Sequence, residues 1–175
     1  MGATSPHFSE AELRCRGAGC NIIPPLSPVR GCGENRAKKE LVDGLEAYRA
    51  LLVTAWTAKL RRPVAEFPGV NVHDAYRCLK HNAESGGAGK SEHVDGLAAD
   101  LSVLGLTPAE LEAIARKIPA IRGIGRQDDR INPVAHVKKP GYIHVDMRPT
   151  LTLARWSYDS SGKWCTYFPP PVIAS

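Results

Sequence analysis

Two short segments, far apart in the chain, carry imidazole and carboxylate groups within apolar, strand-like runs. Ser91–Asp100 reads Ser-Glu-His-Val-Asp-Gly-Leu-Ala-Ala-Asp, which places His93 and Asp100 seven residues apart. Tyr142–Asp146 carries His144 at its centre. An ionised Asp in a buried strand is costly unless it is paired or bound to a metal. The chain must therefore fold so that a partner reaches Asp100.

Two imidazoles and one carboxylate, with a fourth position left to water, form the ligand set of a catalytic zinc site. Gly96 lies between His93 and Asp100 and can turn the chain so that the two side chains converge. Strand side chains alternate, so His144 and Asp146 are expected on one face. Neither segment contains the helical His-Glu-x-x-His pair of ordinary zincins. The sequence predicts a zinc site made by His93, Asp100 and His144.

Length and composition favour one globular domain over residues 1–175, with a core from about residue 7 to 168. Hydrophobic residues make up 43% of the chain and charged residues 23%, as in ordinary water-soluble domains. The net charge of +5 suits an anionic polymer such as a bacterial wall. The basic residues are dispersed and lack interleaved aromatics, which argues against a nucleic-acid partner. We expect a monomer.

Targeting signals are not visible in the sequence. No run approaches the ~20 apolar residues that span a membrane, so no membrane span is predicted. The N-terminal residues lack a charged and then apolar signal segment. The localisation is left open, with action in the periplasm or outside the cell and release by a phage kept as alternatives.

Periodicity predicts an α+β fold. Residues 36–60 form the main helix, and residues 107–118 form a second helix that Thr107 caps. Strands are expected at 69–75, 97–103, 121–125, 141–148, 151–158 and 163–168. We expect a mostly antiparallel sheet with the helices packed on one face. Residues 17–35 form a loop rich in Cys, Pro and Gly, and the polar segment 127–140 forms another loop.

The chain has five cysteines, and three of them lie in the first loop. An odd total leaves at least one cysteine unpaired if disulfides form. A structural zinc in this loop would need a fourth ligand, so we favour a disulfide, with Cys20 to Cys32 as the candidate pair. Cys15 is left without an assignment. Cys78 is interpreted as a small buried apolar residue.

The pattern Ser91-x-His93-x-x-Gly96-x-x-x-Asp100, followed by His144-x-Asp146, resembles the zinc D-alanyl-D-alanine carboxypeptidase family of peptidoglycan peptidases. The resemblance is to the stand-alone peptidase domain, and it extends over roughly residues 7–156. Additional matching pieces are His7 to Cys15, Tyr76-Arg77-Cys78 with His81 and Asn82, Gly123-Ile124-Gly125 and Trp156. The resemblance implies the fold that this family shares with hedgehog signalling domains.

The resemblance also implies roles for single residues. His93, Asp100 and His144 would be the zinc ligands. Arg77 would hold a substrate carboxylate, since a planar guanidinium can bind one through two hydrogen bonds. Ser91 and Tyr76 would line the substrate site.

The general base cannot be transferred from the family. Several branches have an acid three residues before the last His, whereas this chain has Gly141. Asp146 is the first candidate, either as the base or as a carboxylate that orients His144. The loop 127–140 looks like an insertion relative to compact relatives. His136 in this loop is either an acid or transition-state donor, or a solvated loop histidine.

Two classes of function follow from these observations. The first is a zinc peptidase that hydrolyses peptidoglycan stem peptides, either as a DD-carboxypeptidase or as an endopeptidase of the endolysin type. The second is a non-catalytic zinc module that binds the cell wall or another protein. The missing acid at Gly141 keeps the second class open.

Overall fold

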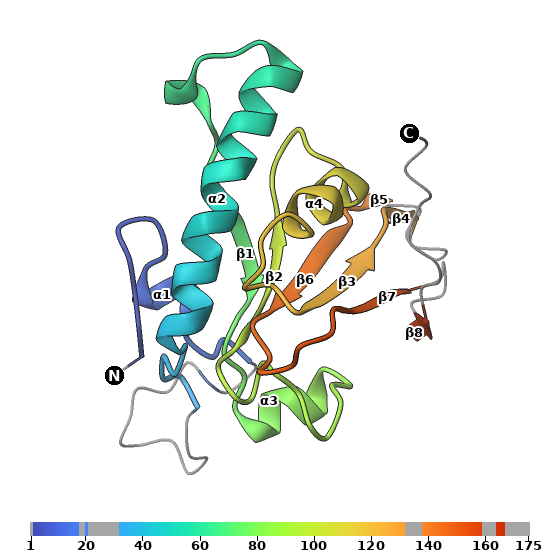
Figure 1. Cartoon of the computed structure of the whole chain (residues 1–175). Helices are drawn as coiled ribbons and strands as arrows, with labels where there is room; N and C mark the ends of the chain where they lie inside the picture. Colours follow the sequence, from blue (N-terminus) through green and yellow to red (C-terminus); the bar gives the residue numbers. More distant parts are fainter. Residues whose placement is uncertain (1, 18–19, 21–31, 132–137, 159–163, 167–175) are drawn as a thin grey trace.

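The fold is seen in a computed structural model, which describes residues 2–17, 20, 32–131, 138–158 and 164–166 (Figure 1). Its helices are α1 (Glu10–Leu13), α2 (Lys39–Leu60), the 3-10 turn η1 (Val64–Glu66), α3 (Leu79–Glu84) and α4 (Pro108–Ala115). Its strands are β1 (Asn71–Asp74), β2 (Ala98–Ser102), β3 (Gly123–Gln127), β4 (Arg130–Ile131), β5 (Lys138–Lys139), β6 (Tyr142–Asp146), β7 (Ala154–Tyr158) and β8 (Trp164–Thr166).

A six-stranded sheet forms the centre of the molecule, with the order β1-β2-β6-β3-β7-β8. Strands β1, β2, β6 and β3 pair antiparallel in turn, and β7 pairs antiparallel with β8. Strands β3 and β7 pair in parallel. The sheet is therefore mixed, which corrects the expected mostly antiparallel sheet. The α+β class is confirmed.

Helices α2 and α4 pack together against one face of this sheet (Figure 1). The buried side of α2 includes a stripe at a spacing of three to four residues, namely Leu41, Leu45, Tyr48, Leu52 and Trp56. The Tyr48 hydroxyl donates to the carbonyl of Leu111 at 2.7 Å and so ties α2 to α4. The predicted Thr107 capping box opens α4, with Pro108 in the first turn.

Alternation along the strands separates the two faces of the sheet. Ala99 and Leu101 of β2, and Ile143 and Val145 of β6, belong to the apolar core beneath the helices. The residues between them, including Asp100 and His144, must point to the other face. This second face carries the buried Asp100, His144 and Asp146.

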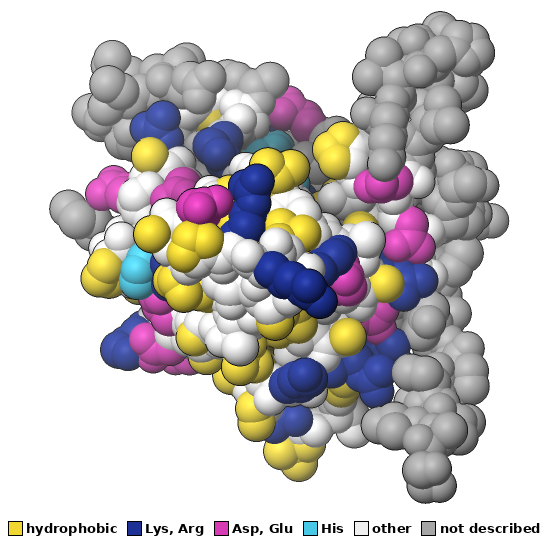
Figure 2. Space-filling view, turned by 90° about the horizontal axis from the view of Figure 1, so that it is seen from above, with side chains coloured by type: hydrophobic (Ala, Val, Ile, Leu, Met, Phe, Trp, Pro, Cys, Tyr) yellow, Lys and Arg dark blue, Asp and Glu magenta, His cyan; other side chains and the backbone are white. Residues whose placement is uncertain are grey.

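On the face at the α2–η1 end, Lys and Arg side chains lie among acidic and hydrophobic ones rather than in one basic field (Figure 2). None of the described helices combines the length and hydropathy that a membrane span requires.

The predicted disulfide between Cys20 and Cys32 is present. Cys78 is fully buried, as expected.

Candidate metal centre

The register of β2 and β6 brings two of the predicted ligands side by side. Asp100 and His144 are direct partners across the antiparallel pair. His93 reaches them from the series of turns that precedes β2, in which the amide of Gly96 donates to the His93 carbonyl. Gly96 has a φ of +71°, a conformation that glycine adopts without strain. Chain reversal at Gly96 therefore aims His93 back at β2.

Three side-chain atoms meet at the resulting point. His93 Nε2 lies 3.1 Å from His144 Nδ1, and His144 Nδ1 lies 2.9 Å from Asp100 Oδ1. The third side of this triangle, from His93 Nε2 to Asp100 Oδ1, is 3.3 Å. All three residues are at least nine-tenths buried. The group has the composition and spacing of a metal-binding site.

Outer hydrogen bonds fix which ring nitrogens carry protons. His93 Nδ1 lies 2.6 Å from the carbonyl oxygen of Ala75, which can only accept, so Nδ1 donates. His144 Nε2 lies 3.1 Å from Asp146 Oδ2 and donates to that carboxylate. In the neutral imidazoles the other nitrogens, His93 Nε2 and His144 Nδ1, present lone pairs towards Asp100 Oδ1.

Three lone pairs this close need a positive charge between them. Without a metal a proton supplies it: burial alone would lower the pKa of His144, but its hydrogen bonds to Asp100 and Asp146 raise it to about 9. Burial alone would likewise raise the pKa of Asp100, yet the two imidazoles hold it well below its usual range.

The triangle also fits zinc. Ligand atoms about 2.0–2.2 Å from a tetrahedral Zn²⁺ lie ~3.4 Å from one another, close to the three distances seen here. The donor set of two imidazoles and a carboxylate matches as well. These residues could therefore hold a zinc ion after a small outward adjustment.

Asp146 lies on the far side of the His144 ring from this point. It is completely buried. The Arg148 guanidinium donates to both of its oxygens, at 2.7 Å from Nε and 2.5 Å from Nη2, and the Arg148 amide donates to Oδ1. Burial would raise the pKa of Asp146, but Arg148 and His144 lower it below its usual range. Asp146 is thus an ionised and fully bonded carboxylate.

Gly123 makes room for this carboxylate. Gly123 is the register partner of Asp146 in the antiparallel pair of β3 and β6. A Cβ at residue 123 would lie 1.9 Å from Asp146 Oδ2. Any larger side chain would displace the carboxylate from His144.

Arg77 is held by two carboxylates. Its Nε donates to Asp74 Oδ2 at 2.6 Å, and its Nη2 donates to Asp100 Oδ2 at 2.7 Å. Asp100 therefore offers one oxygen to the imidazoles and the other to Arg77. Asp74 thus fixes the Nε side of the Arg77 guanidinium.

Three other residues were predicted to belong to the site, namely Ser91, Tyr76 and His136. Ser91 is partly exposed. Its carbonyl accepts a hydrogen bond from the amide of Val94 at the start of the turns that carry His93. Tyr76, expected to line the substrate site, is 5% exposed and packs with buried cysteines. Its role in binding substrate stays a prediction. His136 lies outside the described residues.

Two residues near the centre were missed by the sequence analysis. Arg148 was missed although the alternation of His144, Asp146 and Arg148 pointed to it. Glu92 is partly exposed and interacts electrostatically with Asp146, Arg148 and His144, and burial raises its pKa. Its position next to His93 was the available signal. Trp156, which was noted in the sequence, has its ring centroid 5.1 Å from that of His144.

Comparison with known proteins places this chain in a peptidase family. The family model described as Peptidase M15 matches residues 6–138, about three quarters of the chain. The chain therefore belongs to peptidase family M15, whose members are zinc-dependent metallopeptidases. A search of curated proteins finds no match.

Proposed function

We propose that the protein is a zinc peptidase that hydrolyses stem-peptide bonds of bacterial peptidoglycan. The observation that carries the proposal is the triangle of His93 Nε2, Asp100 Oδ1 and His144 Nδ1 in a chain of family M15. Three buried lone pairs directed at one point are suited to a cation. Membership of family M15 supports the proposal that the cation serves a peptidase that acts on peptidoglycan.

His93, Asp100 and His144 would hold the zinc ion. When bound, zinc would activate a water molecule and polarise the scissile carbonyl. The two outer hydrogen bonds, to the Ala75 carbonyl and to Asp146, hold a proton on the outer nitrogen of each ring, so that the inner nitrogens can present lone pairs to the zinc ion.

Asp146 acts in this proposal as the carboxylate that orients His144. A general base works best with a pKa near the working pH and with a lone pair free for the proton. Asp146 has a lowered pKa, and four hydrogen bonds from Arg148 and His144 occupy its oxygens. Glu92, which is partly exposed beside the same group, is the carboxylate that we assign to proton transfer.

Arg77 has two tasks in the proposal. It fixes Asp100 through Oδ2, and it anchors a carboxylate of the substrate. A guanidinium has five N–H donors, and Asp74 and Asp100 engage Nε and Nη2. The rigid hold on Nε and Nη2 orients the rest of the group for a planar anion.

Digestion of purified peptidoglycan tests the proposal. Zinc-loaded protein is incubated with intact sacculi, and the soluble products are identified by mass spectrometry. Free D-alanine would indicate a carboxypeptidase, separated cross-linked muropeptides a DD-endopeptidase, and new N-terminal D-glutamate an L-alanyl-D-glutamate endopeptidase. We expect one of these products, and its loss with a chelator or in His93→Ala.

A co-sedimentation measurement in the same experiment separates the alternative. Zinc-loaded protein that binds sacculi and releases no peptide product would contradict the peptidase proposal. That result would favour the non-catalytic wall-binding module, for which the glycine at position 141 is the supporting feature.

A further inference from the structure

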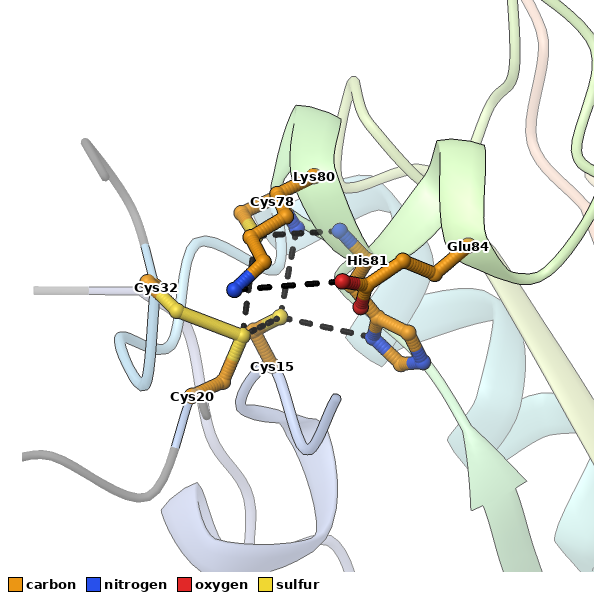
Figure 3. The surroundings of a disulfide bond; sticks show 7 residues. All are labelled: Cys15, Cys20, Cys32, Cys78, Lys80, His81 and Glu84. Atoms are coloured by element: carbon orange, nitrogen blue, oxygen red, sulfur yellow. Dashed lines mark hydrogen bonds and ion pairs between the residues drawn. A yellow bond between two sulfur atoms is a disulfide. The ribbon is translucent and has the colours of Figure 1, made fainter. Parts of the chain in front are cut away.

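A second cluster of metal-binding side chains lies outside the metal centre. Cys15, Cys20, Cys32 and Cys78 come from separate parts of the chain and meet at one point beside α3 (Figure 3). Each is at most 2% exposed. Four buried sulfur atoms from distant segments are more than a single disulfide requires.

The sulfur atoms are spaced as in a thiolate metal site. Cys20 Sγ lies 3.5 Å from Cys15 Sγ and 3.6 Å from Cys78 Sγ. Cys32 is joined directly to Cys20. Sulfurs about 2.3 Å from a tetrahedral zinc ion lie ~3.8 Å from each other.

Backbone amides around the sulfur atoms strengthen the similarity to a thiolate metal site. The amide of Cys78 donates to Cys15 Sγ at 3.2 Å, and the amide of His81 donates to Cys78 Sγ at 3.4 Å. Such N–H donors stabilise thiolates in metal sites. Burial raises the pKa of Cys78, so without a cation the thiol remains protonated.

We propose that Cys15, Cys20, Cys32 and Cys78 bind a second zinc ion when the Cys20–Cys32 disulfide is reduced. A dithiol reductant supplies two electrons and two protons to the disulfide and becomes a disulfide itself. The four thiols then release their protons as the thiolates bind Zn²⁺. In the oxidised protein Cys15 and Cys78 are the two members of this cluster that remain free thiols, too few for a structural site.

This zinc would be structural, because a four-cysteine site leaves no open position. It would join the N-terminal segment to the residues that support the metal centre. Cys78 directly follows Arg77, which holds Asp100. His81 contacts Cys15 Sγ through Nδ1 at 3.4 Å and Asp74 through Nε2 at 3.6 Å. A chain of contacts thus connects the cysteine cluster with Arg77 and Asp100.

Cobalt substitution in the His93→Ala variant tests the proposal without interference from the first site. Thiolate–Co²⁺ bonds give charge-transfer absorption in the near ultraviolet, whereas sites of nitrogen and oxygen ligands do not. Reduced His93→Ala should bind one Co²⁺ per chain and show this absorption. The oxidised variant should show neither. Reduced protein that binds no cobalt, or binds it without thiolate absorption, would overturn the proposal.

Zinc content gives an independent count. Wild-type protein should contain two zinc ions per chain after reduction and one when oxidised. Cys15→Ser and Cys78→Ser should each lose the second ion, while Cys165→Ser, outside the proposed set, should keep it. Retention of both ions in reduced Cys15→Ser and Cys78→Ser would also contradict the assignment. The cobalt measurement in His93→Ala decides the question if these variants fail to fold.

Discussion

At the scale of single residues, the hydrogen bonds of Asp146 support the orienting role that we propose for it. The carboxylate contacts the His144 nitrogen that faces away from Asp100. It therefore sits behind the imidazole, where it can orient the ring and set its tautomer. The sequence could not separate this role from that of a general base, because both need an acid on the strand face of His144.

We predict that Asp146→Asn lowers zinc affinity about 10–100-fold, the usual effect of losing a carboxylate that orients a ligand histidine. Zinc competition with a chromophoric chelator measures this affinity. Glu92→Gln is the matched control: it should keep zinc affinity while turnover of peptidoglycan falls by ~10²-fold or more, as for a lost proton-transfer group. Full zinc affinity in Asp146→Asn would contradict the orienting role.

The second residue-scale prediction concerns Arg77. Arg77→Lys loses the planar group that joins Asp74 and Asp100, because an ammonium cannot reproduce the two directed bonds. We expect a higher KM on stem-peptide substrates together with weaker zinc binding. Steady-state kinetics at saturating zinc isolates the change in KM. Unchanged KM under those conditions would remove Arg77 from substrate binding and leave it a support for Asp100.

At the scale of elements, the pairing of β2, β6 and β3 positions the metal centre. Apolar and polar residues alternate along β2 and β6, so the sequence could predict which residues share a face. It could not predict the parallel pairing of β3 with β7, because strand order depends on contacts between distant segments. The contact of Arg77 with Asp100 escaped prediction for the same reason.

Gly123→Ala tests the close approach of β3 to the metal centre. The added Cβ would push the Asp146 carboxylate away from His144, since Arg148 holds it from the other side. We expect zinc affinity to fall about as far as in Asp146→Asn, roughly 10-fold or more. Gly89→Ala is the control, because a Cβ at Gly89 meets no atom within 4 Å. Equal zinc affinity in the two variants would contradict this account of Gly123.

At the scale of the whole molecule, zinc should contribute to stability by binding only the folded chain. A ligand at about 1,000 times its Kd stabilises a protein by about 4 kcal/mol, which for a chain of this size corresponds to roughly 10 °C in Tm. We expect a chelator to lower the Tm of the oxidised protein by an amount of this order. His93→Ala should start near the lower value and respond little. The same Tm for wild-type protein with and without zinc would refute this prediction.

The most direct test of the zinc assignment is anomalous diffraction at the zinc absorption edge from crystals of the oxidised, zinc-loaded protein. The account predicts one anomalous peak, from a zinc ion that lies about 2.0–2.2 Å from His93 Nε2, Asp100 Oδ1 and His144 Nδ1. Asp146 and Arg148 should lie behind His144, outside the bonding shell. A zinc peak elsewhere in the chain, with His144 still hydrogen-bonded directly to Asp100, would contradict the account.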